Sequence, residues 1–92
     1  MIKTFRNRGL QLFFQTGNAR RLPVQNTARV TMMLQALDAA TKPSDLNLPG
    51  WRWHSLAPGM PGRFALFVSG NYRLTFAFDG ADAVDVDLED YH

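Results

Sequence analysis

The sequence predicts an α+β domain in which two N-terminal helices pack on one face of a mostly antiparallel sheet. In the first half of the chain, apolar residues recur at three- and four-residue spacing, which is typical of helices. After residue 50 the period changes to two, which indicates strands, and turn sequences separate the alternating runs. Helices followed by a strand meander favour a sheet that carries its helices on one face.

The size and composition of the chain exclude several classes of protein. Its 92 residues fit one domain, 1–92, and 46% hydrophobic residues are enough for a core. The absence of cysteine excludes a disulfide scaffold and a zinc–thiolate site. No apolar run approaches the roughly 20 residues that span a bilayer, and the N-terminus lacks the apolar core of a secretory signal. We therefore expect a cytoplasmic protein without a membrane partner.

The first part of the chain predicts a short strand and a helix. Residues 2–5 alternate in polarity, as a short strand does. Residues 7–16 place Leu10, Phe13 and Phe14 on one helical face, and the glycine that follows is a helix stop.

The second predicted helix, residues 25–40, is the clearest element. Its apolar residues recur with helical period: Val30, Met33, Leu34, Leu37 and Ala40. Two starts remain open, because Pro23 can occupy a first turn and Asn26 can cap one. Residues 41–50 contain two prolines and a glycine and form a connection.

The second half of the chain predicts a strand meander. Alternating runs occupy residues 51–54, 64–68, 72–78 and 84–88. A three-residue turn at 69–71 keeps Leu66 and Leu74 on one face, so that Phe67 and Arg73 share the other. In the first run, Arg52 and His54 lie on the face opposite to Trp51 and Trp53, which we expect to face the helices.

The last strand does not fit this scheme. Strict alternation places Asp90 on the same face as Val86 and Leu88. We therefore expect the chain to bend, or its pairing to end, near Glu89.

Charge is distributed unevenly along the chain. Residues 1–73 contain all ten Lys and Arg residues and two acids, a net +8, whereas residues 74–92 contain six acids and no Lys or Arg, a net −6. A basic body can attract a polyanion such as RNA, although a solvated surface of mixed charge explains the same counts equally well.

Four residues of the sequence could together cleave RNA without a metal. RNA supplies its own nucleophile, the 2′-hydroxyl group. Cleavage then needs a base, an acid and positive charge at the phosphate. His54, His92, Arg73 and Asp90 could supply these, and Tyr91 or Phe67 could stack on a base.

Spacing alone leaves other interpretations open. His54 can be a surface histidine of a strand, Arg73 a plain exposed residue, and residues 90–92 a frayed end. A metal site formed by His54, Asp90 and His92 is a further alternative, although no pair of these ligands has helical spacing.

Longer strings resemble a known family over essentially the whole chain. They are Met1–Phe5, Leu34–Thr41, Gly70–Phe76 with its Asn-Tyr-Arg centre, and Val84–His92 with its terminal Asp-Tyr-His. The chain resembles the HigB (plasmid-maintenance killer) branch of the RelE-like toxins. The resemblance implies a compact microbial-RNase-like fold and an endoribonuclease that cuts mRNA in the ribosomal A site, with no metal or other cofactor.

The resemblance also implies partners and site residues. The partner is a helix-turn-helix antitoxin of the HigA type, and DNA is contacted only through the toxin–antitoxin complex. The catalytic residues fall on His54, Arg73, Asp90, Tyr91 and His92.

The chain departs from the family where cations are expected. Ala57 stands where a lysine is common, and Phe67 stands where a basic residue is frequent. Loss of these charges weakens phosphate contacts. We assign RNA binding to Arg52, Arg63 and Phe67, and keep a binding module without nuclease activity as the alternative.

Overall fold

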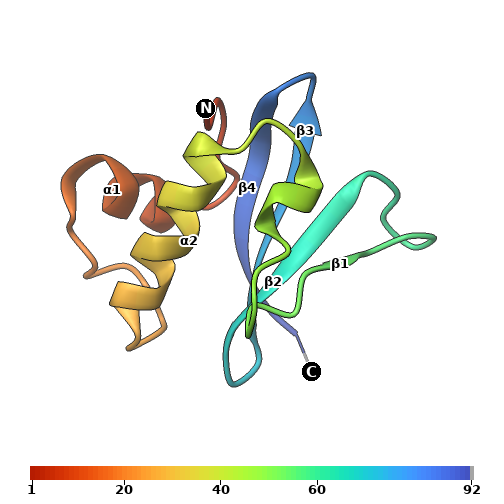
Figure 1. Cartoon of the computed structure of the whole chain (residues 1–92). Coiled ribbons are helices and arrows are strands. Elements are labelled where there is room, and N and C mark those ends of the chain that lie inside the picture. The colour runs from red at the N-terminus through yellow and green to blue at the C-terminus, as the bar shows by residue number, and fades with distance from the viewer. Residues whose placement is uncertain (92) are drawn as a thin grey trace.

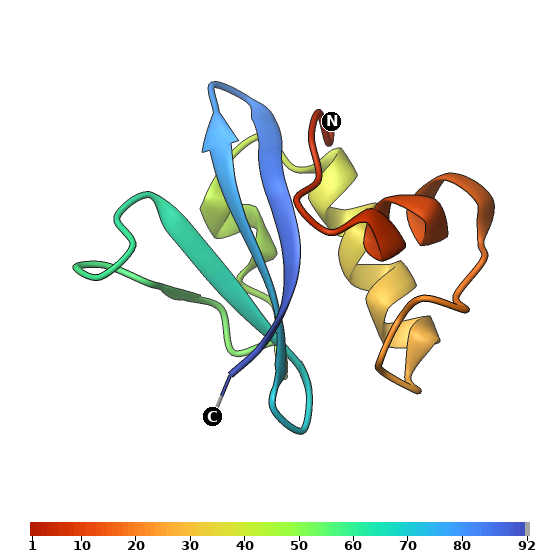
Figure 2. The same cartoon turned by 180° about the vertical axis from the view of Figure 1, so that it is seen from behind.

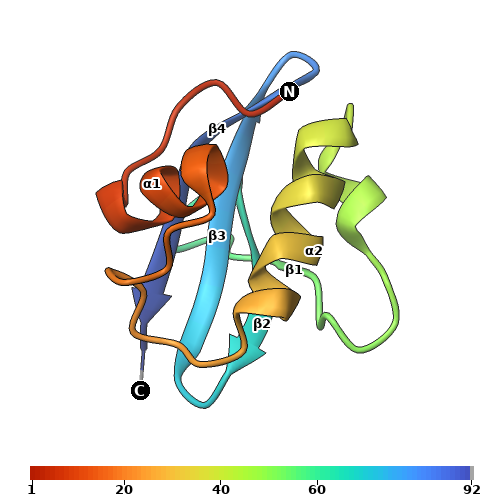
Figure 3. The same cartoon turned by 90° about the vertical axis from the view of Figure 1, so that its left-hand side faces the viewer.

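A computed structural model describes residues 1–91 and confirms the predicted α+β architecture (Figure 1). Two helices, α1 (Arg8–Thr16) and α2 (Thr27–Ala39), precede an antiparallel sheet of four strands in the order β1-β2-β3-β4. The strands are β1 (His54–Ser55), β2 (Arg63–Ser69), β3 (Tyr72–Asp79) and β4 (Asp82–Asp90), and a 3-10 helix, η1 (Pro43–Leu46), follows α2. Both helices lie on the same side of the sheet (Figures 1 and 3).

Local signals set the ends of both helices. The Asn7 side chain accepts a hydrogen bond from the Leu10 N–H, and Gly17 ends α1 with a left-handed φ of 78°. Of the two starts that the sequence left open for α2, the structure selects Asn26, whose side chain accepts from the Arg29 N–H. Within residues 1–91, no helix has the length and apolar character that crossing a bilayer requires.

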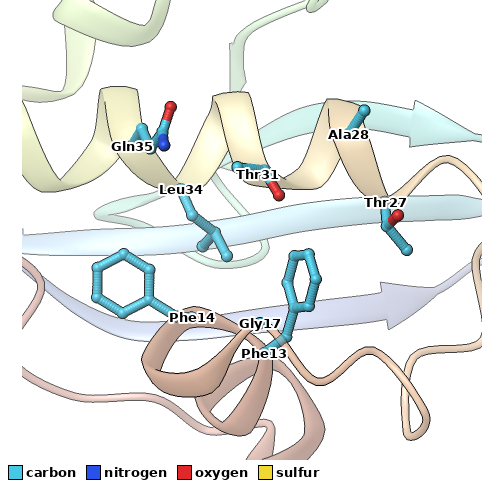
Figure 4. A pocket seen from close by; sticks show the side chains of 8 residues that line it. All are labelled: Phe13, Phe14, Gly17, Thr27, Ala28, Thr31, Leu34 and Gln35. Atoms are coloured by element: carbon cyan, nitrogen blue, oxygen red, sulfur yellow. The ribbon is translucent and has the colours of Figure 1, made fainter.

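The core fills the space between the helices and the sheet. Its fully buried side chains include Leu10, Met33, Leu34, Leu37, Leu66, Leu74, Phe76 and Val86. Between the two helices, Phe13 and Phe14 point from α1 toward Leu34 of α2 and line a groove of about 410 Å³ (Figure 4). This groove opens on the helical side of the molecule.

The predicted N-terminal strand is only partly formed. Ile2 and Phe5 make isolated parallel bridges to Ala83 and Val86, beside the outer edge of β4. The backbone between them adds two hydrogen bonds, from the Lys3 N–H to the Ala83 carbonyl and from the Val86 N–H to the Thr4 carbonyl. The segment therefore covers the edge of β4 without becoming a regular strand.

The first predicted strand is shorter than expected. The alternation at 51–54 predicted a strand there, but β1 contains only residues 54 and 55. Arg52 has φ of 52°, a left-handed conformation that interrupts extended backbone. The predicted faces are nevertheless confirmed, because Trp51 is buried in the core and Trp53 stacks on Phe64, with 5.4 Å between the ring centroids.

The expectation for the last strand is confirmed in where the pairing ends, but the alternation is not broken there. β4 ends at Asp90, one residue after Glu89, and Asp90 lies opposite Tyr72 on the same face as Leu88. The irregularity occurs earlier, where Asp85 has φ of 52° and the register with β3 shifts. This bulge adds one residue to β4.

The bulge also changes which residue enters the core. The sequence alternation placed Val84 on the buried face together with Val86 and Leu88. In the structure Ala83 is fully buried instead, and Val84 pairs with the half-exposed Ala77. An extra residue reverses the alternation on one side of the bulge, which explains the exchange.

Candidate functional site

One face of the sheet is turned away from α1 and α2, and we call it the open face (Figure 2). The strand register places side chains capable of chemistry on this face. Residues directly opposite each other in antiparallel strands share a face. His54 lies opposite Ala65, and Ala65 lies opposite Thr75, so these residues form one row across three strands. The next row on the same face consists of Phe67, Arg73 and Glu89. The predicted pairing of Phe67 with Arg73 is therefore confirmed.

His54 is exposed at the edge of the open face, and its tautomer is set by the backbone. Its Nδ1 atom lies 2.7 Å from the carbonyl oxygen of Arg52. A carbonyl can only accept, so Nδ1 carries the proton in this contact. In the neutral ring, Nε2 is then the acceptor, which is the arrangement a general base needs.

The left-handed backbone at Arg52 contributes to this contact. The turn at φ of 52° directs the Arg52 carbonyl to the ring two residues later. The Arg52 guanidinium carbon lies 4.9 Å from the centroid of the Phe67 ring, in a cation–π contact. Arg29 approaches the same ring at 5.8 Å and donates to the Phe67 carbonyl. Both Arg52 and Phe67, predicted to bind RNA, thus lie together beside His54.

Arg73 lies between a carboxylate and an aromatic ring. Its Nη2 atom is 3.2 Å from Oε1 of Glu89, and its guanidinium carbon is 4.3 Å from the centroid of the Tyr91 ring. About 10 Å, two strand spacings, separates the backbone of β1 from that of β3. Arg73 and His54 therefore face the same open surface from different strands, as the sequence predicted.

Arg63, assigned to RNA binding from the sequence, is buried rather than displayed. Only 6% of the residue is exposed. Its Nη2 atom donates to Thr75 Oγ1 at 2.8 Å and to the Asp85 carbonyl at 2.9 Å. Burial lowers the pKa of the Arg63 guanidinium, and the nearby positive charge of Arg6 acts in the same direction. These hydrogen bonds connect Arg63 to the buried Thr75 of β3 and to the bulge of β4.

Sequence reasoning missed two residues, Thr75 and Glu89. They connect Arg63 to Arg73 in a network of hydrogen bonds on the open face. Thr75 is fully buried and donates a hydrogen bond from Oγ1 to Oε2 of Glu89 at 2.6 Å. Burial raises the pKa of Glu89, but the hydrogen bonds from Thr75 and Arg73, together with the charges of Arg73 and Arg63, outweigh it and lower that pKa overall. The alternation of Arg73 and Thr75 on one face was the available signal, but it did not reveal their partner on β4.

The C-terminal residues divide between the two faces. Asp90 lies opposite Tyr72, which packs against the core, so it starts on the face opposite to Arg73, and its Oδ1 accepts from Asn71 Nδ2 at 2.9 Å. Tyr91 returns to Arg73, and its N–H donates to the Asn71 carbonyl at 2.8 Å. His92, predicted as catalytic, lies outside the described residues.

The structure also bears on the metal-site alternative. His54 and Asp90 start on opposite faces of the sheet. Over residues 1–91, no group of three His, Cys, Asp or Glu side chains is arranged to hold a metal ion. On the open face of the described chain, His54 can transfer a proton, Arg73 can stabilise negative charge and Tyr91 can stack on a base.

Comparison with known proteins gives two findings. The family model described as the RelE-like toxin of the type II toxin–antitoxin system HigB matches residues 3–92. A protein of Proteus vulgaris named Endoribonuclease HigB is 38% identical to this chain over 92 residues, which cover the whole of both sequences.

Proposed function

The chain belongs to the family of RelE-like toxins of HigB type II toxin–antitoxin systems, and from this premise we propose that it cuts mRNA on the ribosome as a metal-independent endoribonuclease. The relative from Proteus vulgaris, whose name states an endoribonuclease, supports the activity. The observation that carries the proposal is the joint placement of His54, Arg73 and Tyr91 on the open face.

The proposed reaction uses the RNA as its own nucleophile. The 2′-oxygen attacks the adjacent phosphorus, a base takes the 2′-hydroxyl proton, and an acid protonates the departing 5′-oxygen. The P–O5′ bond breaks as the new O2′–P bond forms, which leaves a 2′,3′-cyclic phosphate and a 5′-hydroxyl. Charge grows on the non-bridging oxygens, where a guanidinium stabilises it.

We assign the role of the base to His54 and the stabilisation of the phosphate charge to Arg73. His54 presents Nε2 as an acceptor because Nδ1 donates to the Arg52 carbonyl, so we assign it the 2′-hydroxyl proton. Arg73 keeps its planar guanidinium against Tyr91, which leaves the fork in place for phosphate oxygens. Tyr91 is 43% exposed and can stack on a neighbouring base.

The C-terminal end supplies the remaining roles in this proposal. His92 is assigned as the acid for the departing 5′-oxygen, on the basis of the family resemblance. Asp90 orients His92 from the end of β4, where Asn71 holds its carboxylate. Arg52 and Phe67, paired at 4.9 Å, form the RNA-binding edge beside His54. Arg63 donates to Thr75 and to the Asp85 carbonyl, so it is not part of this edge.

The partners follow from the family and from the charge distribution. As the toxin of a type II pair, the protein has an antitoxin partner. We propose that this partner is a helix-turn-helix protein of the HigA type, that DNA is bound only through the complex, and that the protein acts in the cytoplasm. The net charge of +8 over residues 1–73 favours the ribosomal A site, where RNA phosphates surround the mRNA.

The test is induced expression in bacteria that lack the antitoxin, with 5′ ends of mRNA mapped. We expect growth arrest and new 5′ ends inside translated codons for the wild type, and neither for His92→Ala or Arg73→Ala. Arg8→Ala, an exposed cation at the start of α1, is the matched control and should behave as the wild type.

Two other outcomes would contradict the proposal. Arrest without new 5′ ends, unchanged in both site variants, would identify a binding module of the same fold. Cleavage of free RNA in the absence of ribosomes, if a chelator abolishes it, would identify a metal-dependent hydrolase instead.

A further inference from the structure

We propose that Glu89 is a positioning residue for Arg73, and that the buried pair Thr75 and Arg63 holds Glu89 in place for this purpose. The inference rests on the proposed function, because it concerns how the guanidinium assigned to the phosphate is kept in position. It assigns a role to three residues outside the group of His54, Arg73 and the C-terminal residues.

The hydrogen bonds of this network have a fixed direction. A guanidinium can only donate, so Thr75 Oγ1 accepts from Arg63 Nη2 at 2.8 Å and uses its own proton toward Glu89 Oε2 at 2.6 Å. The other carboxylate oxygen, Oε1, accepts from Arg73 Nη2 at 3.2 Å. Glu89 thus receives a donor at each oxygen, which fixes the orientation of its carboxylate plane.

The network is anchored in the interior and ends at the open face. Thr75 is fully buried and Arg63 is 6% exposed, while the side chains of Glu89 and Arg73 are 24% and 15% exposed. Arg63 also donates to the carbonyl of Asp85 at the bulge of β4. The rigid part of the sheet therefore sets the position of a guanidinium whose other side contacts Tyr91.

Glu89 lies directly opposite Arg73 because of the register that the bulge creates. Closely placed opposite charges on adjacent strands form a hydrogen bond stronger than a neutral one. Loss of that bond frees the long Arg73 side chain to sample other rotamers. Since small displacements of a catalytic group reduce rates strongly, we expect the cleavage step to slow.

The principal variant is Glu89→Gln, which keeps the shape of the side chain. With its oxygen toward Arg73, the amide accepts from the guanidinium without the charge of a carboxylate, and its nitrogen can donate to Thr75 Oγ1. With its nitrogen toward Arg73, two donors face each other and that contact is lost. The charged hydrogen bond to Arg73 is therefore removed in either orientation. The matched control is Asp87→Asn on the same strand and face. It removes the same charge, and its Oδ1 accepts from the neighbouring Leu88 N–H.

The assay is single-turnover cleavage on ribosomes programmed with a defined mRNA, with toxin concentration varied. For Glu89→Gln we expect the saturating rate to fall by about 10-fold or more and the half-saturating concentration to change far less. Asp87→Asn should keep the wild-type rate. A wild-type rate for Glu89→Gln, or an equal loss in Asp87→Asn, would overturn the inference.

A spectroscopic measurement separates this inference from the proposed function. The Nε–Hε resonance of Arg73, assigned with Arg73→Lys, should shift and broaden in Glu89→Gln and stay in place in Asp87→Asn. This readout needs no RNA cleavage, so it tests the positioning role even if the wild type does not cut mRNA. An Arg73 resonance that is unchanged in Glu89→Gln would contradict it.

A second pair of variants keeps the inference testable if Glu89→Gln fails to fold. Thr75→Ser retains the hydroxyl group that connects Arg63 to Glu89, and Thr75→Val replaces it at nearly equal size. We expect Thr75→Ser to cleave at close to the wild-type rate and Thr75→Val to be slower. Equal rates in the two variants would show that the hydroxyl group has no positioning role.

Discussion

The two faces of the sheet bury their side chains in different ways. The face covered by α1 and α2 buries apolar residues such as Leu66, Leu74 and Phe76 against the helices. The open face buries the charged Arg63 and the polar Thr75 instead, beside the half-buried pair of Arg73 and Glu89. Strands β2, β3 and β4 thus supply apolar core residues on one face and the hydrogen-bonded network of charged residues on the other.

This difference indicates where stability and activity reside. Apolar burial stabilises the fold by roughly 25 cal/mol per Å². Buried polar groups without partners cost stability, and within residues 1–91 the Nε and Nη1 atoms of Arg63 and the Nε atom of Arg73 have none. We therefore expect substitutions on the helix-covered face to change stability and substitutions on the open face to change cleavage.

The largest expected effect is on the open face. Replacing the proposed base in His54→Ala should lower the single-turnover cleavage rate by about 10²- to 10⁴-fold. The side chain is exposed, so the free energy of unfolding should change little. Ser55→Ala, the neighbour on β1, is the control for cleavage. A destabilised His54→Ala protein with normal cleavage would reverse the assignment of the two faces.

The next effect lies on the helix-covered face. Phe76 is fully buried and contacts the rings of Phe64 and Phe78. Phe76→Ala should lower the free energy of unfolding by about 3–5 kcal/mol. Urea denaturation measures this loss, and Phe78→Ala, at a half-buried position of the same strand, should lose less. Equal losses would show that burial on this face does not set the stability.

A smaller effect tests the comparison at the N-terminal end of α2. Asn26 caps α2 by accepting from the Arg29 N–H at 3.1 Å. Asn26→Ala should lower the free energy of unfolding by about 1 kcal/mol and leave cleavage unchanged, because the cap lies in the helical layer. Gln25→Ala is the adjacent control in the same urea series. A change in cleavage without a change in stability would show that α2 communicates with the open face.

The smallest expected effect sharpens the role of the charged network. The pKa of Glu89 is lower in the folded protein than in the unfolded chain. Its ionised carboxylate therefore stabilises the fold at any pH above the unfolded pKa. This stabilisation is lost as the pH falls through the folded pKa. Urea midpoints measured from neutral pH to below the ordinary range of glutamate, near pH 4, should therefore fall less steeply for Glu89→Gln than for the wild type. Asp87→Asn is the control, and identical slopes for wild type and Glu89→Gln would contradict the prediction.

Local pattern determined much of this protein. The period of the apolar residues gives the order of helices and strands, and Asn7 and Gly17 mark the ends of α1. Alternation with a short turn was enough to place Arg73 opposite Phe67. These features were predictable because each depends on residues close together in the chain.

Only the tertiary structure decided which groups meet in the network on the open face. The bulge at Asp85 places Ala83 in the core, and the pairing of β3 with β4 sets Glu89 rather than Asp90 beside Arg73. Burial of Arg63 likewise depends on the assembled strands. Register, bulges and burial arise from backbone and packing contacts between distant segments, which no local period encodes. The sequence by itself thus determined the order of the helices and strands and the faces of β2 and β3, and the tertiary structure determined the face of Ala83 and the partners of the charged residues.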